Sequence, residues 1–68
     1  MKENYDHTDR FIRETECKIL TGLSRTTRWR LAKNGSFPKN YKISSGIRAW
    51  KLTDLRNWID QASNEYKN

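Results

Sequence analysis

Residues 21–38, TGLSRTTRWRLAKNGSFP, decide the fold of this chain. Gly22 can adopt the positive φ that ends one helix, and Ser24 can accept the free amide hydrogens at the start of the next. The second helix is then predicted over residues 25–34, because the Asn34-Gly35 pair ends it. Two short helices joined by a turn of three or four residues that contains glycine form a helix-turn-helix unit.

The two faces of this second helix differ in chemistry. At about 100° per residue, Thr27 and Leu31 fall on one side, which we expect to pack inward. The opposite side is polar and cationic and holds Arg25, Thr26, Trp29 and Lys33. In a helix-turn-helix unit the second helix is the one that enters the major groove of DNA.

A shorter helix is predicted before this segment. Thr15 is its expected N-cap, and Cys17, Ile19 and Leu20 form an apolar stripe that stops at the Gly22 turn. The helix is about two turns long.

The chain after residue 38 predicts a hairpin and a third helix. Phe37-Pro38 breaks the helical pattern, and residues 41–43 and 48–50 are short alternating runs around a Ser-Ser-Gly turn. A two-stranded hairpin is marginal alone, so Tyr41, Ile43 or Trp50 must pack on the helices. Thr53 is the expected N-cap of the last helix. Its inward face follows the i, i+3, i+4, i+7 spacing, with Leu55, Trp58, Ile59 and Ala62.

The fold class expected is mostly α with a small β-hairpin. It consists of three short helices plus a wing, which is the hairpin formed by residues 41–50. A single domain is predicted over residues 10–64, preceded by a flexible arm at residues 1–9 and followed by frayed residues 65–68.

Charge is concentrated in the middle of the chain. Residues 22–51 carry eight basic side chains and no acidic one, whereas the segments on either side are slightly acidic. Such a stretch attracts polyanions, and neutralising phosphates releases counterions from nucleic acid. An ordinary solvated basic surface is the alternative explanation.

Several classes are disfavoured by composition. One cysteine and one histidine allow neither an internal disulfide nor a zinc-ligand cluster, so we expect no metal, no cofactor and no enzymatic activity. No window has the apolar length of a secretion signal or membrane span, so no membrane partner is expected and the cytoplasm, at the nucleoid, is the expected location.

The order of residues resembles the AlpA family of prophage transcriptional regulators, relatives of excisionase and MerR-type winged-helix domains. The matching stretches are Arg10-Phe11-Ile12-Arg13, Glu16, residues 21–27 (TGLSRTT), Arg30-Leu31, residues 35–39 (GSFPK), Trp50 and Trp58. The resemblance implies a winged helix-turn-helix that regulates integrase or excision genes of a mobile element, with its second helix in the major groove and its wing on the adjacent backbone or minor groove. Arg28 departs from the family, which usually has an aliphatic residue there.

Candidate DNA contacts come from the second helix and the wing: Ser24, Arg25, Thr26, Arg28, Trp29, Arg30, Lys33, Lys42 and Arg48. Arginine can bind guanine with two hydrogen bonds and a threonine methyl can contact thymine, but contact with phosphate alone is an equal alternative for Arg25. Arg30 and Lys33 are expected to contact phosphate rather than bases. Arg28 could instead form an intramolecular ion pair, and Trp29 could pack under the wing. The wing itself could be an ordinary exposed turn.

Three functions remain open from the sequence. The leading one is a sequence-specific transcriptional regulator that binds double-stranded DNA, with self-association on DNA and integrase as further candidate partners. The closest alternative is an excisionase-like recombination directionality factor that binds and bends attachment-site DNA. The third is an antirepressor that binds an acidic protein.

Overall fold

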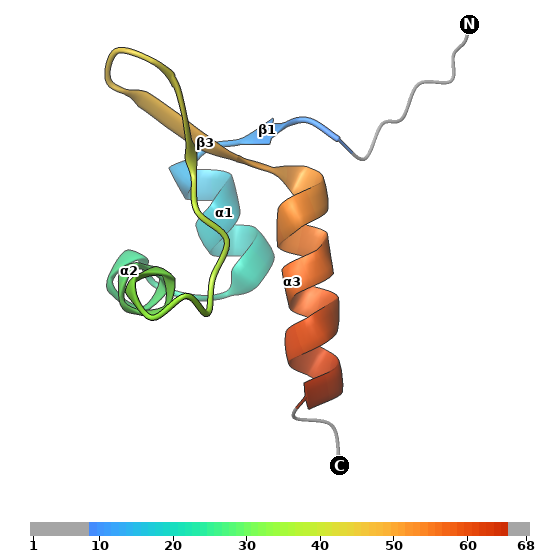
Figure 1. The fold of residues 1–68 in the computed structure, drawn as a ribbon. Coiled ribbons are helices and arrows are strands. Elements are labelled where there is room, and N and C mark those ends of the chain that lie inside the picture. The colour runs from blue at the N-terminus through green and yellow to red at the C-terminus, as the bar shows by residue number, and fades with distance from the viewer. Residues whose placement is uncertain (1–8, 66–68) are drawn as a thin grey trace, which may run out of the picture.

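The computed structural model describes residues 9–65 of the 68-residue chain. Its elements follow the order β1 (Phe11–Ile12), α1 (Glu14–Thr21), α2 (Arg25–Lys33), β2 (Tyr41–Ser44), β3 (Ile47–Lys51) and α3 (Leu52–Glu65). The expected class, mostly helical with a small β element, is confirmed (Figure 1). Of the predicted arm and frayed end, residues 1–8 and 66–68 lie outside the described residues; Glu65 is still helical.

The β element is a three-stranded antiparallel sheet of order β1-β3-β2, not the two-stranded hairpin expected from the sequence. β1 pairs with β3 with Ile12 opposite Trp50, and this ladder ends in a hydrogen bond from the amide of Leu52 to the carbonyl of Arg10 at 2.9 Å. Because β1 is only two residues long, its sequence has no alternating pattern, and its pairing depends on residues far along the chain.

Two predicted helix starts are wrong. α1 begins at Glu14, with Arg13 as its cap, because the carbonyl of Arg13 accepts from the amide of Cys17 at 2.9 Å. α3 begins at Leu52, immediately after β3, because the bond to Arg10 satisfies the Leu52 amide. Thr15 and Thr53 therefore lie inside the first turns of these helices and do not cap them.

The core lies between α1, the sheet and α3. Its buried residues are Ile12, Cys17, Phe37, Trp50, Leu52 and Leu55, with Leu20, Leu23, Leu31, Ala32 and Trp58 packed against them. Ile19, expected in the apolar stripe of α1, is instead 75% exposed. It lies about 200° around the helix from the buried Cys17 and so points to solvent.

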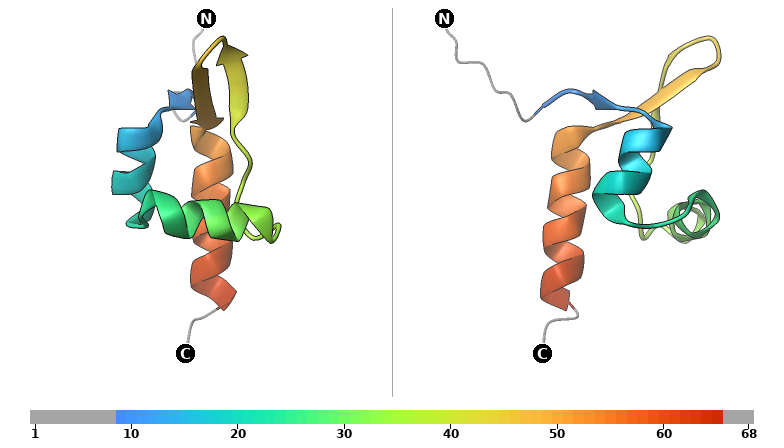
Figure 2. Two further views of the ribbon diagram at one scale, coloured as in Figure 1. Left: turned by 90° about the vertical axis from the view of Figure 1, so that its left-hand side faces the viewer. Right: turned by 180° about the vertical axis from the view of Figure 1, so that it is seen from behind.

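The arrangement places α2 and the wing on one side of the molecule. Viewed from that side, α2 lies across the front with the β2–β3 hairpin above it and α3 behind (Figure 2). The turn of the hairpin is closed by Gly46 at φ 75°, a conformation that glycine adopts without strain. The helix and hairpin that carry the central basic residues thus share one surface.

Candidate nucleic-acid interface

The start of α2 is fixed by the cap that the sequence predicts. Ser24 has extended φ/ψ, and its hydroxyl accepts a hydrogen bond from the amide of Thr27 at 3.2 Å. The preceding turn is set by Gly22, whose φ is 72° and whose amide donates to the carbonyl of Lys18 at 2.8 Å. The turn conformation and the cap together set where α2 begins, and so they set the directions in which the side chains of its first turn leave the helix.

The outward face of α2 is as predicted. Leu31 packs against the core and Thr27 is half-buried, whereas the predicted contact residues Arg25, Thr26, Trp29, Arg30 and Lys33 are exposed. Trp29 is 62% exposed, with the ammonium of Lys33 at 4.8 Å from its ring centroid. The wing therefore does not cover Trp29, and its indole is available on the surface of α2.

Arg28 is the exception among the predicted contact residues. Its side chain is 3% exposed and turns inward, where its guanidinium forms a two-pronged ion pair with Glu14. Its Nε also donates to the carbonyl of Leu23 at 3.1 Å. The structure thus corrects the placement of Arg28 on the contact surface and supports the intramolecular ion pair that the sequence left open.

The wing carries its cations as a cross-strand pair. Lys42 lies opposite Arg48, and both are exposed, so the two like charges project from the same face of the hairpin. Arg48 is oriented by Asn40, whose side-chain oxygen accepts from Nη1 at 3.1 Å. Like charges directly opposite each other destabilise a hairpin, and a bound anion would relieve that repulsion.

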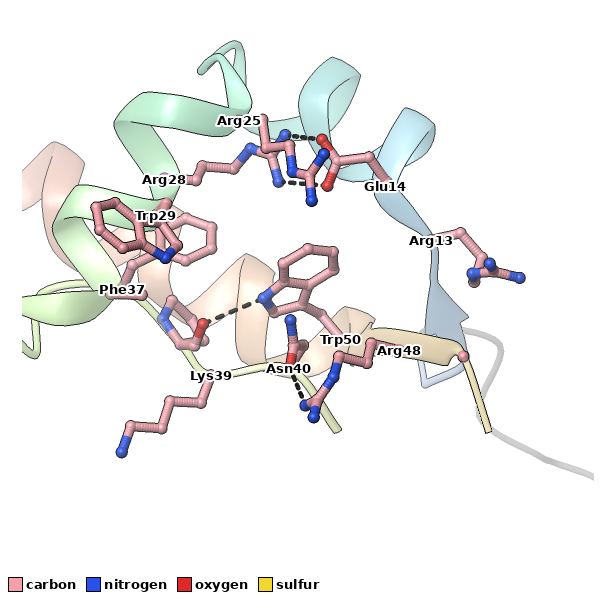
Figure 3. Close-up of a pocket in the computed structure, with 13 residues that line it drawn as sticks. Arg13, Glu14, Arg25, Arg28, Trp29, Phe37, Lys39, Asn40, Arg48 and Trp50 are labelled. Carbon is pink, nitrogen blue, oxygen red and sulfur yellow. Dashed lines mark hydrogen bonds and ion pairs between the residues drawn. The ribbon is translucent and has the colours of Figure 1, made fainter. Parts of the chain in front are cut away.

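A groove of about 630 Å³ runs between α2 and the wing (Figure 3). It is lined by Arg13, Glu14, Arg25, Arg28, Trp29, Ala32, Phe37, Pro38, Lys39, Asn40, Gly46, Arg48 and Trp50. Arg25 and Trp29 of α2 line one side and Arg48 of the wing the other, so the groove joins the two parts of the predicted contact surface.

Two basic residues of the groove were missed from the sequence. Lys39 is exposed and lies in the central basic run, directly after Pro38, so its charge was a usable signal. Arg13 is also exposed, but it belongs to the slightly acidic N-terminal segment. Only the fold places Arg13, which lies between β1 and α1, among the residues that line this groove.

The charge of the groove is almost entirely positive. Among the described residues that line it, Glu14 is the single carboxylate, and the hydrogen bonds from Arg28 lower the pKa of Glu14 below its usual range. The positive charge of Arg25 lowers that pKa further, while the bond to Glu14 raises the pKa of Arg28. Glu14 is thus ionised and neutralised by Arg28, which leaves the charges of Arg13, Arg25, Lys39 and Arg48 unopposed within the groove.

The described residues offer little for other kinds of chemistry. Across residues 9–65, no three histidine, cysteine or acidic side chains gather as a metal site would require. None of the three helices in that range combines the length and apolar character needed to cross a membrane.

Comparisons with known proteins place the chain in a family. The family model described as "Prophage CP4-57 regulatory protein (AlpA)" matches residues 10–63. An uncharacterized protein of Enterobacteria phage P4, ORF88, is 33% identical over 51 residues, which are 75% of this chain. The match spans 58% of the length of that phage protein. No solved structure matches the chain significantly.

Proposed function

The chain belongs to the AlpA family of prophage regulatory proteins, and from this membership and the basic groove we propose that it is a sequence-specific transcriptional regulator that binds double-stranded DNA. The observation that carries the proposal is the groove itself. Cations of α2 and of the wing face one another across it, and its one carboxylate among the described residues is neutralised by Arg28.

The dimensions of α2 suit the major groove. An α-helix with its side chains is about 10–12 Å across, and the major groove of B-form DNA is about 12 Å wide. With α2 docked there, the phosphodiester strand that borders the major groove passes between α2 and the wing. Lys42 and Arg48 then lie on the adjacent backbone or in the minor groove.

The residues of α2 divide by role. Arg25 and Thr26, in the first turn after the Ser24 cap, are the residues that we assign to base edges. Arg30 and Lys33 lie further along the same exposed face and are assigned to phosphates, as is the N–H of Trp29. Ser24 acts through its cap, because its hydroxyl is already bonded to Thr27.

Binding-site selection from a randomised duplex pool, in the presence of competitor DNA, tests the proposal. We expect a recurring motif, and footprinting of that motif in the genome of origin should locate it at promoters. Recovery of attachment-site repeats would assign the protein to recombination, and a footprint longer than one protomer covers would indicate self-association on DNA. Failure to enrich any motif, with no affinity for duplex DNA at low salt, would contradict the proposal.

A further inference from the structure

Arg28 contacts three separate parts of the fold at once, and Figure 3 shows its ion pair with Glu14 and its place near Trp50. Its two terminal nitrogens bond Glu14, the first residue of α1, and its Nε bonds the carbonyl of Leu23 in the turn between the helices. Its guanidinium carbon lies 5.6 Å from the ring centroid of Trp50 in β3. A single side chain of α2 therefore touches the first helix, the turn and the base of the wing.

Trp50 belongs to β3, and contacts of its own fix its side chain at the base of the wing. The indole N–H donates to the carbonyl of Pro38 at 3.1 Å, and its ring meets Phe37 edge-on with centroids 6.4 Å apart. Trp50 and Arg48 are two residues apart in β3, so both side chains project from the same face of the strand. The position of Trp50 consequently sets the position from which Arg48 extends.

Arginine is suited to this place by its geometry. Its planar fork supplies five N–H donors in fixed directions and its flat face can lie on an aromatic ring, whereas a lysine ammonium offers neither. A buried charge is tolerated only when it is paired and hydrogen-bonded, and Arg28 meets that condition through Glu14 and Leu23. Because the side chain is 3% exposed and its guanidinium is directed at Glu14 and Leu23, Arg28 does not face a phosphate on the protein surface.

We propose that Arg28 is a positioning residue for DNA binding, which holds α2 and the wing at the separation that lets Arg25 and Arg48 engage one duplex together. The proposal rests on the proposed function and assigns to Arg28 a role without DNA contact. Its physical basis is preorganisation: a wing held in place contributes its full contact energy, whereas a loosened wing loses much of that energy to the entropy of being ordered on binding.

A double-mutant cycle tests this coupling. Affinity is measured by fluorescence anisotropy with a fluorescein-labelled mixed-sequence DNA duplex at low salt, for Arg48→Ala in the wild-type and Arg28→Met backgrounds. We expect Arg48→Ala to weaken binding about fivefold in the wild type and less than about twofold beside Arg28→Met, because coupled residues are non-additive. Arg56→Met is the matched control, since Arg56 is exposed on α3 and lies outside the groove. In that background the fivefold effect should persist, and an equal effect beside Arg28→Met would overturn the proposal.

Glu14→Gln provides a second background in case Arg28→Met does not fold. Glu14 is 48% exposed, so glutamine fits there, but it cannot give Arg28 a charged two-pronged acceptor. Removing this negative charge from the groove would, by electrostatics alone, tighten DNA binding and leave the effect of Arg48→Ala unchanged. The positioning role instead predicts that the Arg48→Ala effect shrinks, and an unchanged effect would overturn it.

The N–H signals of the two arginines distinguish positioning from contact. In nuclear magnetic resonance spectra we expect the Nε–H of Arg28 to stay protected from solvent exchange and unshifted when the duplex is added, while that of Arg25 shifts. An Arg28 signal that shifts and loses protection would show direct DNA contact and overturn the proposal. A wild-type protein that does not bind the duplex would overturn the proposed function itself, whereas binding without coupling between Arg28 and Arg48 overturns the positioning role alone.

Discussion

Lys42 lies directly opposite Arg48 across the two strands of the wing, and both side chains are exposed. Like charges directly opposite each other across two strands destabilise a hairpin. Asn40 holds Arg48 in place by a hydrogen bond, so the pair is kept together despite its repulsion. Binding of a polyanion would relieve the repulsion between the two side chains, so the pair favours anion binding at a cost to the stability of the free hairpin.

Arg48→Ala should therefore separate affinity from stability. Binding to all duplexes is expected to weaken by a similar amount, about 1 kcal/mol for one lost charge-assisted contact, while thermal stability stays equal or rises slightly. Anisotropy titrations on a selected and an unrelated duplex, with thermal melts, check both parts. If specific binding fell while non-specific binding held constant, Arg48 would be reading bases.

Arg25→Ala and Ser24→Ala should have opposite signatures, although the residues are adjacent. Arg25 is exposed in the first turn of α2, so its removal should leave the melting temperature unchanged and weaken binding to the selected site by about 1–3 kcal/mol, with relaxed preference at one base position. Ser24→Ala removes the cap to Thr27 and should reduce the free energy of unfolding by about 1 kcal/mol. An Arg25→Ala protein that melts much earlier, or binds its site as tightly as before, would contradict this division.

Trp29 should report DNA binding by fluorescence. Trp50 is buried and Trp58 is half-buried, whereas Trp29 is 62% exposed on the face assigned to DNA. Acrylamide should quench Trp29 in the free protein and much less in the complex, because the duplex would cover the indole. The difference between wild type and Trp29→Phe isolates this signal. Equal quenching with and without a saturating duplex would place Trp29 outside the interface.

The salt dependence of binding should be steep. If about five phosphates per protomer are neutralised, a plot of log K against log salt concentration should have a slope of about −4 to −5. Titrations of the mixed-sequence duplex over a range of salt concentrations measure it. A slope near zero would show that α2 and the wing do not bind DNA mainly through phosphates.

Acid should destabilise the protein through Glu14. The hydrogen bonds from Arg28 place the pKa of folded Glu14 below the ordinary glutamate value of 4.5, so the pair stabilises the folded state above that pH. This stabilisation is lost as the pH falls below 4.5 and through the lowered pKa of the folded state. Thermal melts of wild type and Glu14→Gln across this range should converge as the pH falls.

Glu16→Gln is the matched comparison for that experiment, because the bond to Arg10 lowers the pKa of Glu16 in the same direction while Arg10 is 55% exposed and Arg28 only 3%. We expect a smaller pH-dependent difference from wild type for Glu16→Gln, since solvent screens an exposed pair more strongly. A difference between Glu14→Gln and wild type that stays constant at every pH would show that the ionisation of Glu14 contributes nothing to folding stability.

The sequence alone determined the features that depend on neighbours along the chain. The Ser24 cap, the extent of α2 and the outward face that carries Arg25 and Trp29 follow from turn chemistry and helical period, which act within a few residues. The hairpin pattern also predicted that Tyr41, Ile43 or Trp50 packs on the helices, and of these Trp50 is buried.

Only the tertiary structure decided which cations face the groove and which do not. Arg28 and Arg25 are one helical turn apart and have the same side chain, yet Arg28 is buried because Glu14, fourteen residues earlier, supplies a charged acceptor that offsets its desolvation. Arg13 enters the groove because β1 pairs with β3 across nearly forty residues of chain. Such contacts depend on long-range pairing and packing energies, which no local pattern of residues encodes.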